Sequence, residues 1–186
     1  MNYILLAINR IWKYINSTEV LHLFLENRFF LILCVLILSA LKHKTYRSMI
    51  LVSLINIPGT FLHETAHFLV GFLLNARPTS FTLIPHKSGD AYVMGSVGFK
   101  NIKFYNALPS AMAPLLLLVA GYYFNLWFFT HVHINLWTYF GYIIMQTIII
   151  ENALPSSTDF KVAFSNLLGV LFYGIIIVVA LVMFID

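Results

Sequence analysis

Apolar residues dominate the chain in long blocks separated by short polar stretches. Four blocks reach roughly the 20 residues that a helix needs to cross a bilayer, and they cover residues 48–74, 107–129, 135–154 and 164–185. A fifth block, 29–41, is shorter, and we expect the Glu26 and Arg28 side chains before it to lie near an interface or against other helices. The pattern predicts an all-α polytopic membrane protein of about five transmembrane helices.

The first 19 residues have a different pattern, in which apolar residues alternate with Arg10, Trp12 and Lys13. This mixture is typical of an amphipathic segment that lies on a membrane surface. No small-residue cleavage site follows an apolar core, so we do not expect a removable signal peptide. We therefore interpret residues 1–186 as one membrane-embedded domain that ends in the transmembrane helix 164–185.

Composition agrees with this assignment. Of the 186 residues, 60% are hydrophobic and 10% are charged, and the mean hydropathy is +0.86, which excludes an ordinary soluble domain. The single cysteine, Cys34, excludes an intrachain disulfide and a cysteine-rich metal site, and we expect a buried thiol.

The positive charges are spread over the loops, and the net charge is only +4, so we expect no nucleic-acid partner. If five helices alternate in direction, Lys42, Lys44 and Arg47 fall on one side of the membrane. The other side then carries Arg10, Lys13, Arg77, Lys87, Lys100, Lys103 and Lys161. This excess places the amino terminus and the loop 75–106 in the cytoplasm.

The block 48–74 contains the sequence HETAH, from His63 to His67. On a helix, the two histidines are one turn apart on the same face and can bind one zinc ion, while Glu64 lies beside them as a base for a water molecule. Ionisable residues inside a membrane span cost on the order of 2.5 to 3.5 kcal/mol each on insertion scales, which favours a functional site.

Polar and small residues form a single stripe along this predicted helix, at steps of three or four: Ser53, Asn56, Thr60, His63, His67 and Gly71. Lipid offers such side chains no hydrogen bonds, so the stripe is expected to face the protein interior or a water-filled cavity. Pro58 and Gly59 precede the motif by one turn and can kink the helix there.

A catalytic zinc ion usually has three protein ligands, and the helix supplies two. Asp159 is our first choice for the third, because Asn152 and Pro155 end the block 135–154 and leave Asp159 in a short polar stretch that we expect to be non-helical. Glu151 is the alternative ligand, and an ordinary solvated role for Asp159 also remains open. The pentapeptide NALPS occurs at 106–110 and 152–156, which we interpret as two similar helix-boundary turns.

Together, HETAH within an apolar helix and the later Asn152, Pro155 and Asp159 resemble the site-2 protease family of intramembrane zinc metalloproteases. The resemblance covers residues 48–160, which would form the three-helix metalloprotease core of that family. Three residues separate Pro155 from Asp159 and Phe160 follows, whereas the family commonly has four residues and then glycine.

The resemblance implies one Zn²⁺ per chain, held by His63, His67 and Asp159, with Glu64 as general base. Asn152 would position the substrate or stabilise an oxyanion. The implied reaction is hydrolysis of a peptide bond within or beside a transmembrane segment of another membrane protein, and we expect a bacterial or archaeal plasma membrane.

Segment 78–104 has strand-like content, SFTLI and AYVMGSVGF, on either side of the turn HKSGD. It predicts a small β-hairpin directly after the zinc helix. One edge of this hairpin could pair with an extended substrate, or the hairpin could merely cap the bundle.

Two other functions fit the same residues. The polar stripe could form a proton or ion pathway in a transporter, which would need no bound zinc. Alternatively, the chain could be a catalytically inactive scaffold that binds membrane helices, although an intact Glu64 argues against lost activity. The sequence leaves the oligomeric state open.

Overall fold

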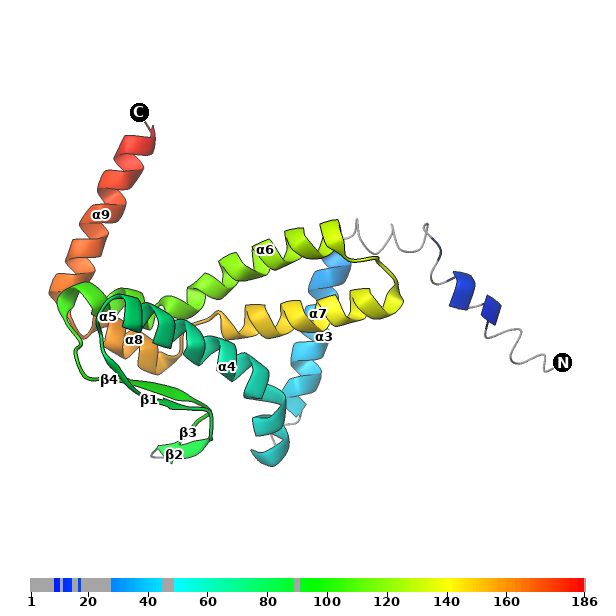
Figure 1. Cartoon of the computed structure of the whole chain (residues 1–186), viewed down its shortest axis with the longest axis horizontal. Coiled ribbons are helices and arrows are strands. Elements are labelled where there is room, and N and C mark those ends of the chain that lie inside the picture. The colour runs from blue at the N-terminus through cyan, green and yellow to red at the C-terminus, as the bar shows by residue number, and fades with distance from the viewer. Residues whose placement is uncertain are drawn as a thin grey trace.

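The structure is a computed structural model that describes residues 9–10, 12–14, 17, 28–44, 49–88 and 91–185. It is mostly helical, with two small antiparallel sheets (Figure 1). The longer helices are α3 (Arg28–Lys44), α4 (Met49–Leu73), α6 (Leu116–His131), α7 (Leu136–Asn152) and α9 (Leu167–Ile185). The shorter elements between them are α5 (Phe104–Ala111), the 3-10 turn η2 (Ala113–Leu115) and α8 (Ser157–Phe164).

Most of the predicted amphipathic segment 1–19 lies outside the described residues. Within it, residues 12–14 are helical and exposed, and the ring of Trp12 lies 6.1 Å from that of Trp137 at the start of α7. Glu26 also lies outside the described residues.

Apolar blocks of the sequence correspond to helices, but the block 107–129 does not form one continuous helix. Pro109 lies inside α5 and Pro114 begins η2, so the block divides into α5, η2 and α6. Pro109 has no N–H group for the carbonyl of Tyr105 four residues earlier, and the Tyr173 hydroxyl of α9 donates to that carbonyl instead, at 2.5 Å. The carbonyl that Pro109 leaves without a helix partner therefore accepts a hydrogen bond from α9.

Only part of this helical structure meets a length and hydropathy criterion for crossing a membrane. Among the described residues, the stretch Ala113–His131 qualifies alone. A second span results if Ser157–Phe164 and Leu167–Met183, which meet at 88°, are counted as one broken helix.

The centre of the fold is the antiparallel pair α6 and α7, with α3 packed across it (Figure 1). One buried cluster joins Phe128 to the first half of α7, through Tyr139, Tyr142 and Ile143, and the half-buried Cys34 and Leu38 of α3 pack against it. A second cluster, of Leu117, Ile149 and Ala153, packs against Leu62 of α4 and Phe124. This second cluster brings the HETAH helix to the last turn of α7.

α3 crosses α7 steeply (Figure 1). Cys34 and Leu38 contact the first half of α7, whereas Lys42 contacts Glu151 in its last turn, at 2.5 Å. Five helices that alternate in direction would place Lys42 on the opposite side from Glu151, so this contact disagrees with the position predicted for Lys42. Hydropathy identifies α3 as an apolar helix, but it carries no information about the direction in which this helix packs.

The predicted β-structure after the HETAH helix is confirmed, except that residues His86–Ser88, expected in the turn, form a strand. β1 (Pro78–Thr82) pairs antiparallel with β4 (Ser96–Phe99), and the shorter β2 (His86–Ser88) and β3 (Ala91–Val93) extend from them as a second pair. Phe81 of β1 makes edge-on ring contacts with Phe61 and Phe68 of α4, at 6.3 and 6.0 Å. The sheet therefore lies directly on the helix that carries the two histidines.

Candidate metal centre

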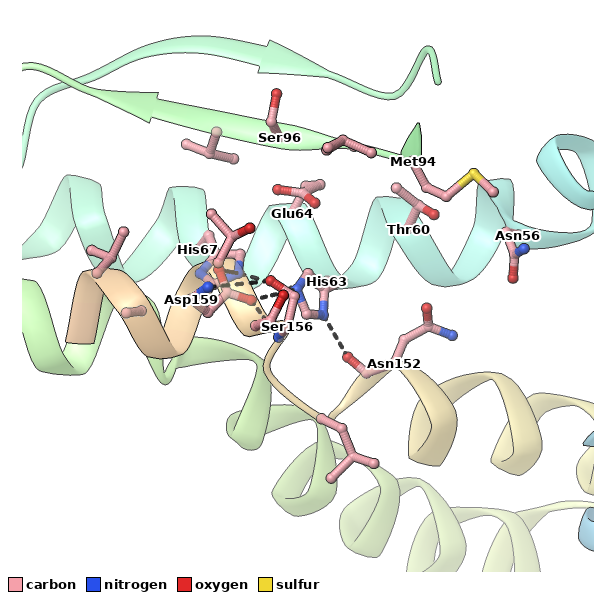
Figure 2. A pocket seen from close by; sticks show the side chains of 18 of the residues that line it. Asn56, Thr60, His63, Glu64, His67, Met94, Ser96, Asn152, Ser156 and Asp159 are labelled. Carbon is pink, nitrogen blue, oxygen red and sulfur yellow. Dashed lines mark hydrogen bonds and ion pairs between the residues drawn. The ribbon is translucent and has the colours of Figure 1, made fainter. Parts of the chain in front are cut away.

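Three side chains meet where α4 passes the start of α8. The Nε2 atoms of His63 and His67 are 3.1 Å apart, and the carboxylate oxygens of Asp159 lie 3.4 Å from the first and 3.2 Å from the second. Figure 2 shows the three side chains converging between the two helices. Their ligand atoms all lie within 4.8 Å of one another.

Backbone carbonyls orient both histidines. His63 Nδ1 lies 2.8 Å from the carbonyl oxygen of Asn152, and His67 Nδ1 lies 2.7 Å from that of Ser110. A carbonyl oxygen only accepts hydrogen bonds, so each Nδ1 must carry the proton and donate it. In the neutral form of each ring, the Nε2 lone pair is then directed at the same point, as metal-ligating histidines require, whereas a proton on Nε2 would be donated to Asp159.

These distances fit a tetrahedral metal ion. Zinc lies about 2.0 to 2.1 Å from its nitrogen and oxygen ligands, so tetrahedral ligand atoms are about 3.3 to 3.4 Å apart. The three observed separations, 3.1, 3.2 and 3.4 Å, are close to this value. Without a cation or a proton between them, two lone pairs and a carboxylate would repel one another, so the donor set suits a divalent cation.

Asp159 reaches the site from a helix, not from the non-helical stretch that we expected. Ser156 caps α8: its side chain accepts from the Asp159 N–H at 3.2 Å, and the Asp159 carboxylate accepts from the Ser156 N–H at 2.6 Å. This reciprocal pair is a capping box, and the spacing S-x-x-D in the sequence is its known signal. The box fixes the Asp159 side chain with one oxygen toward each histidine.

The pKa of Asp159 lies well below its ordinary value. Partial burial raises it, but hydrogen bonds with His63, His67 and Ser156 together lower it by more. The carboxylate is therefore ionised at neutral pH, which is the form that binds a cation.

Glu64 lies on a neighbouring flank of α4 and is 6% exposed. Figure 2 shows its side chain on the face of the helix toward Ser96. A Cβ atom at Gly95 would lie 2.9 Å from Glu64 Cγ, so glycine lets the segment before β4 lie directly over this carboxylate. No residue pattern indicates this role of Gly95.

Asn152 is placed beside the metal centre, but its side chain has a different contact from the one expected. Its Nδ2 donates to the carbonyl of Ile148 in its own helix, at 2.8 Å, and its side chain packs on Gly59 of α4. A Cβ at Gly59 would lie 2.1 Å from that Nδ2. In this structure, the backbone carbonyl of Asn152 is the group that contacts His63.

Glu151 does not join the three ligand atoms. Lys42 donates to one of its carboxylate oxygens at 2.5 Å, and Ser39 donates to the other. The Glu151 carboxylate is therefore held by α3.

A cavity of about 720 Å³ opens over the three ligands. Its walls come from α4, from the segment that leads into β4, and from the turn between α7 and α8. Polar side chains line much of it: Asn56, Thr60, Glu64, Ser96, Glu151, Asn152, Ser156, Ser157 and Thr158. The site is thus open on one side to a cavity with a largely polar lining.

No protein-family model matches the chain, and searches of curated proteins and of solved structures find no significant match either.

Proposed function

We propose that the protein is an intramembrane zinc metalloendopeptidase of the site-2 protease type. The observation that carries the proposal is the convergence of His63, His67 and Asp159 within 4.8 Å, with both histidines oriented by carbonyls and the open side facing a cavity that contains Glu64. Three ligands with an open fourth position are typical of catalytic zinc rather than structural zinc.

When bound here, zinc would polarise the scissile carbonyl and lower the pKa of a water ligand. The residues of the chain provide the rest. Glu64 accepts the proton of the attacking water and returns it to the amide nitrogen as the C–N bond breaks, so its carboxylate is regenerated. The two histidines donate their Nδ1 protons to backbone carbonyls, and the Asp159 carboxylate accepts from the Ser156 N–H, so these three ligands act without exchanging protons with the substrate.

A membrane location is supported by the side chains on the helix surfaces. Large apolar residues are exposed along α9, with Leu168, Ile175 and Met183 at 70%, 65% and 76%. Apolar area of this extent needs a bilayer or a partner to cover it. We accordingly propose a multi-pass protein in a prokaryotic plasma membrane.

The contact of Lys42 with Glu151 moves Lys42 to the side of the metal centre, and the contact of Trp12 with Trp137 moves the amino-terminal segment away from it, but the side proposed for the metal centre stays the same. Several positive charges belong to the elements around the metal centre: Lys42 at Glu151, Arg77 and Lys100 after α4, Lys103 at the start of α5 and Lys161 in α8. Arg10, Lys13 and Arg28 belong to the opposite end, where Trp12 contacts Trp137. This excess favours the cytoplasmic side for the metal centre.

The proposed substrate is a transmembrane segment of another protein, bound in extended form. Within the described sheets, β4 pairs only with β1, and its Ser96 and Val97 line the cavity. Figure 2 shows β4 as the strand nearer to α4. A peptide that pairs with the second edge of β4 would pass between the strand and Glu64.

Metal content tests this proposal. Detergent-purified wild type should contain about one zinc per chain by mass spectrometry. His67→Ala and Asp159→Ala should lose it, because each removes one of only three ligands. Glu64→Gln should keep the zinc and lose cleavage of a membrane-protein substrate. A folded wild type without zinc, purified without chelators, would overturn the proposal and favour an ion pathway or a scaffold.

A further inference from the structure

The last turn of α7 is held from two sides, and one of them is α3. Ser39 and Lys42 lie three residues apart on one face of α3, and together they donate to both carboxylate oxygens of Glu151. The side chains of Lys42 and Glu151 are only 18% and 22% exposed. A half-buried carboxylate with a donor on each oxygen has little freedom to move, because another position would leave its charge unpaired.

On the other side, the residue after Glu151 contacts α4. The carbonyl of Asn152 accepts the Nδ1 proton of His63, and the Asn152 side chain lies against Gly59 with no room for a Cβ. Ala153, the next residue, is fully buried. Any shift of the last turn of α7 would therefore move the group that orients a metal ligand.

We propose that Ser39 and Lys42 are positioning residues of the metal centre, acting through Glu151 on the Asn152 carbonyl and hence on His63. The inference rests on the proposed zinc site. Among the described residues, α3 contributes no metal ligand. Its proposed role is to hold the last turn of α7 in the position that orients His63.

Positioning and simple electrostatics predict opposite results, which makes the inference testable. By Coulomb's law, removing the positive charge of Lys42 near a dication should strengthen zinc binding. Loss of positioning should weaken it, because residues that orient metal ligands typically change metal affinity 10- to 100-fold when replaced.

The decisive variant is Lys42→Met with Glu151→Gln, because the net charge of the pair is zero before and after the change. Zinc affinity is measured by competition with a chelator, and the visible absorption of Co²⁺ in the same site reports ligand geometry. We expect roughly tenfold weaker zinc binding and an altered Co²⁺ spectrum. Wild-type affinity and spectrum in the folded double variant would overturn the inference, even if its thermal stability falls.

Three further variants complete the test. Lys44→Met changes the same charge at an exposed position of the same helix, and should leave affinity and spectrum unchanged. Lys42→Arg keeps a donor and the charge, and should retain most of the affinity. Ser39→Ala removes only one hydrogen bond, so it supplies a folded test protein if the double variant does not fold, and wild-type values there would contradict the inference. Failure of the wild type to bind zinc would instead refute the proposed function.

Discussion

The two NALPS segments, 106–110 and 152–156, lie on either side of the metal centre and adopt different structures. The first is helical throughout and forms most of α5, with Pro109 inside the helix. The second ends α7 at Asn152, turns at Pro155, and begins α8 with Ser156 as its cap. Each segment nevertheless supplies one backbone carbonyl to one histidine, Ser110 to His67 and Asn152 to His63.

This difference shows how neighbouring residues decide the structure of an identical pentapeptide. Asn106 accepts from the Lys103 N–H at the start of α5, so the helix begins before the proline. In the second copy the asparagine is already the last residue of a helix, and Ser156 finds Asp159 three residues later. The position equivalent to Asp159 after the first copy is Ala113, so only one segment could provide a metal ligand.

The largest difference between the segments should appear at their first residue. Asn106 is fully buried and its side chain makes three hydrogen bonds, to Lys103 N, Leu74 O and Asn101 O. Asn106→Ala leaves these groups unpaired and should lower the free energy of unfolding by about 3 kcal/mol. Asn152→Ala loses one hydrogen bond within its own helix, and should cost about 1 kcal/mol or less.

Thermal unfolding in detergent measures both variants under the same conditions. A cost for Asn152→Ala equal to that for Asn106→Ala would contradict this contrast. In that case the Asn152 side chain would have a structural role beyond its bond to Ile148.

A smaller effect is expected at Gly59, which only the second segment contacts. The new Cβ in Gly59→Ala would overlap the Asn152 side chain, so the last turn of α7 must shift, at a cost of about 1 to 3 kcal/mol. Zinc affinity should fall as well, because the Asn152 carbonyl moves with this turn. Chelator competition measures the affinity, and adding Asn152→Ala should restore most of it. An affinity that stays low in the double variant would place the conflict elsewhere.

The smallest effects should distinguish the two serines. Ser156→Ala removes the cap of α8 and should cost about 1 kcal/mol in thermal unfolding, with a modest loss of zinc affinity because Asp159 becomes less well fixed. The hydroxyl of Ser110 is buried without a hydrogen-bond partner in the described structure. Ser110→Ala should therefore leave stability unchanged or raise it slightly. A destabilising Ser110→Ala would reveal a partner, such as a buried water.

Sequence alone was enough for the helical character, the short strands after the HETAH helix and the grouping of His63 with His67. The i, i+4 spacing of the two histidines is sufficient to predict that they lie on one face of a helix. The strand-like residues on either side of a turn are sufficient to predict the hairpin. The break between two apolar blocks indicates Asp159 as the third metal ligand, and the structure brings Asp159 to the two histidines. The helix that carries Asp159 was missed, although S-x-x-D at 156–159 is a local signal for it.

Other features depend on contacts between distant segments and could not be obtained from the pattern. The way in which α3 crosses α7 is set by packing, which hydropathy does not describe. The contact of Lys42 with Glu151 joins residues more than 100 positions apart. The carbonyls of Ser110 and Asn152 belong to the main chain, so no residue type indicates that they orient a histidine.

That use of main-chain carbonyls has a consequence for how the site tolerates mutation. Every residue type carries the same carbonyl, so replacing Ser110 or Asn152 cannot delete the acceptor of either histidine. Only changes that move the backbone can disturb it, at positions such as Gly59 where two segments approach closely. The orientation of the two histidines thus depends on the path of the backbone. Substitutions at Ser110 and Asn152 that leave the backbone in place would keep both hydrogen bonds.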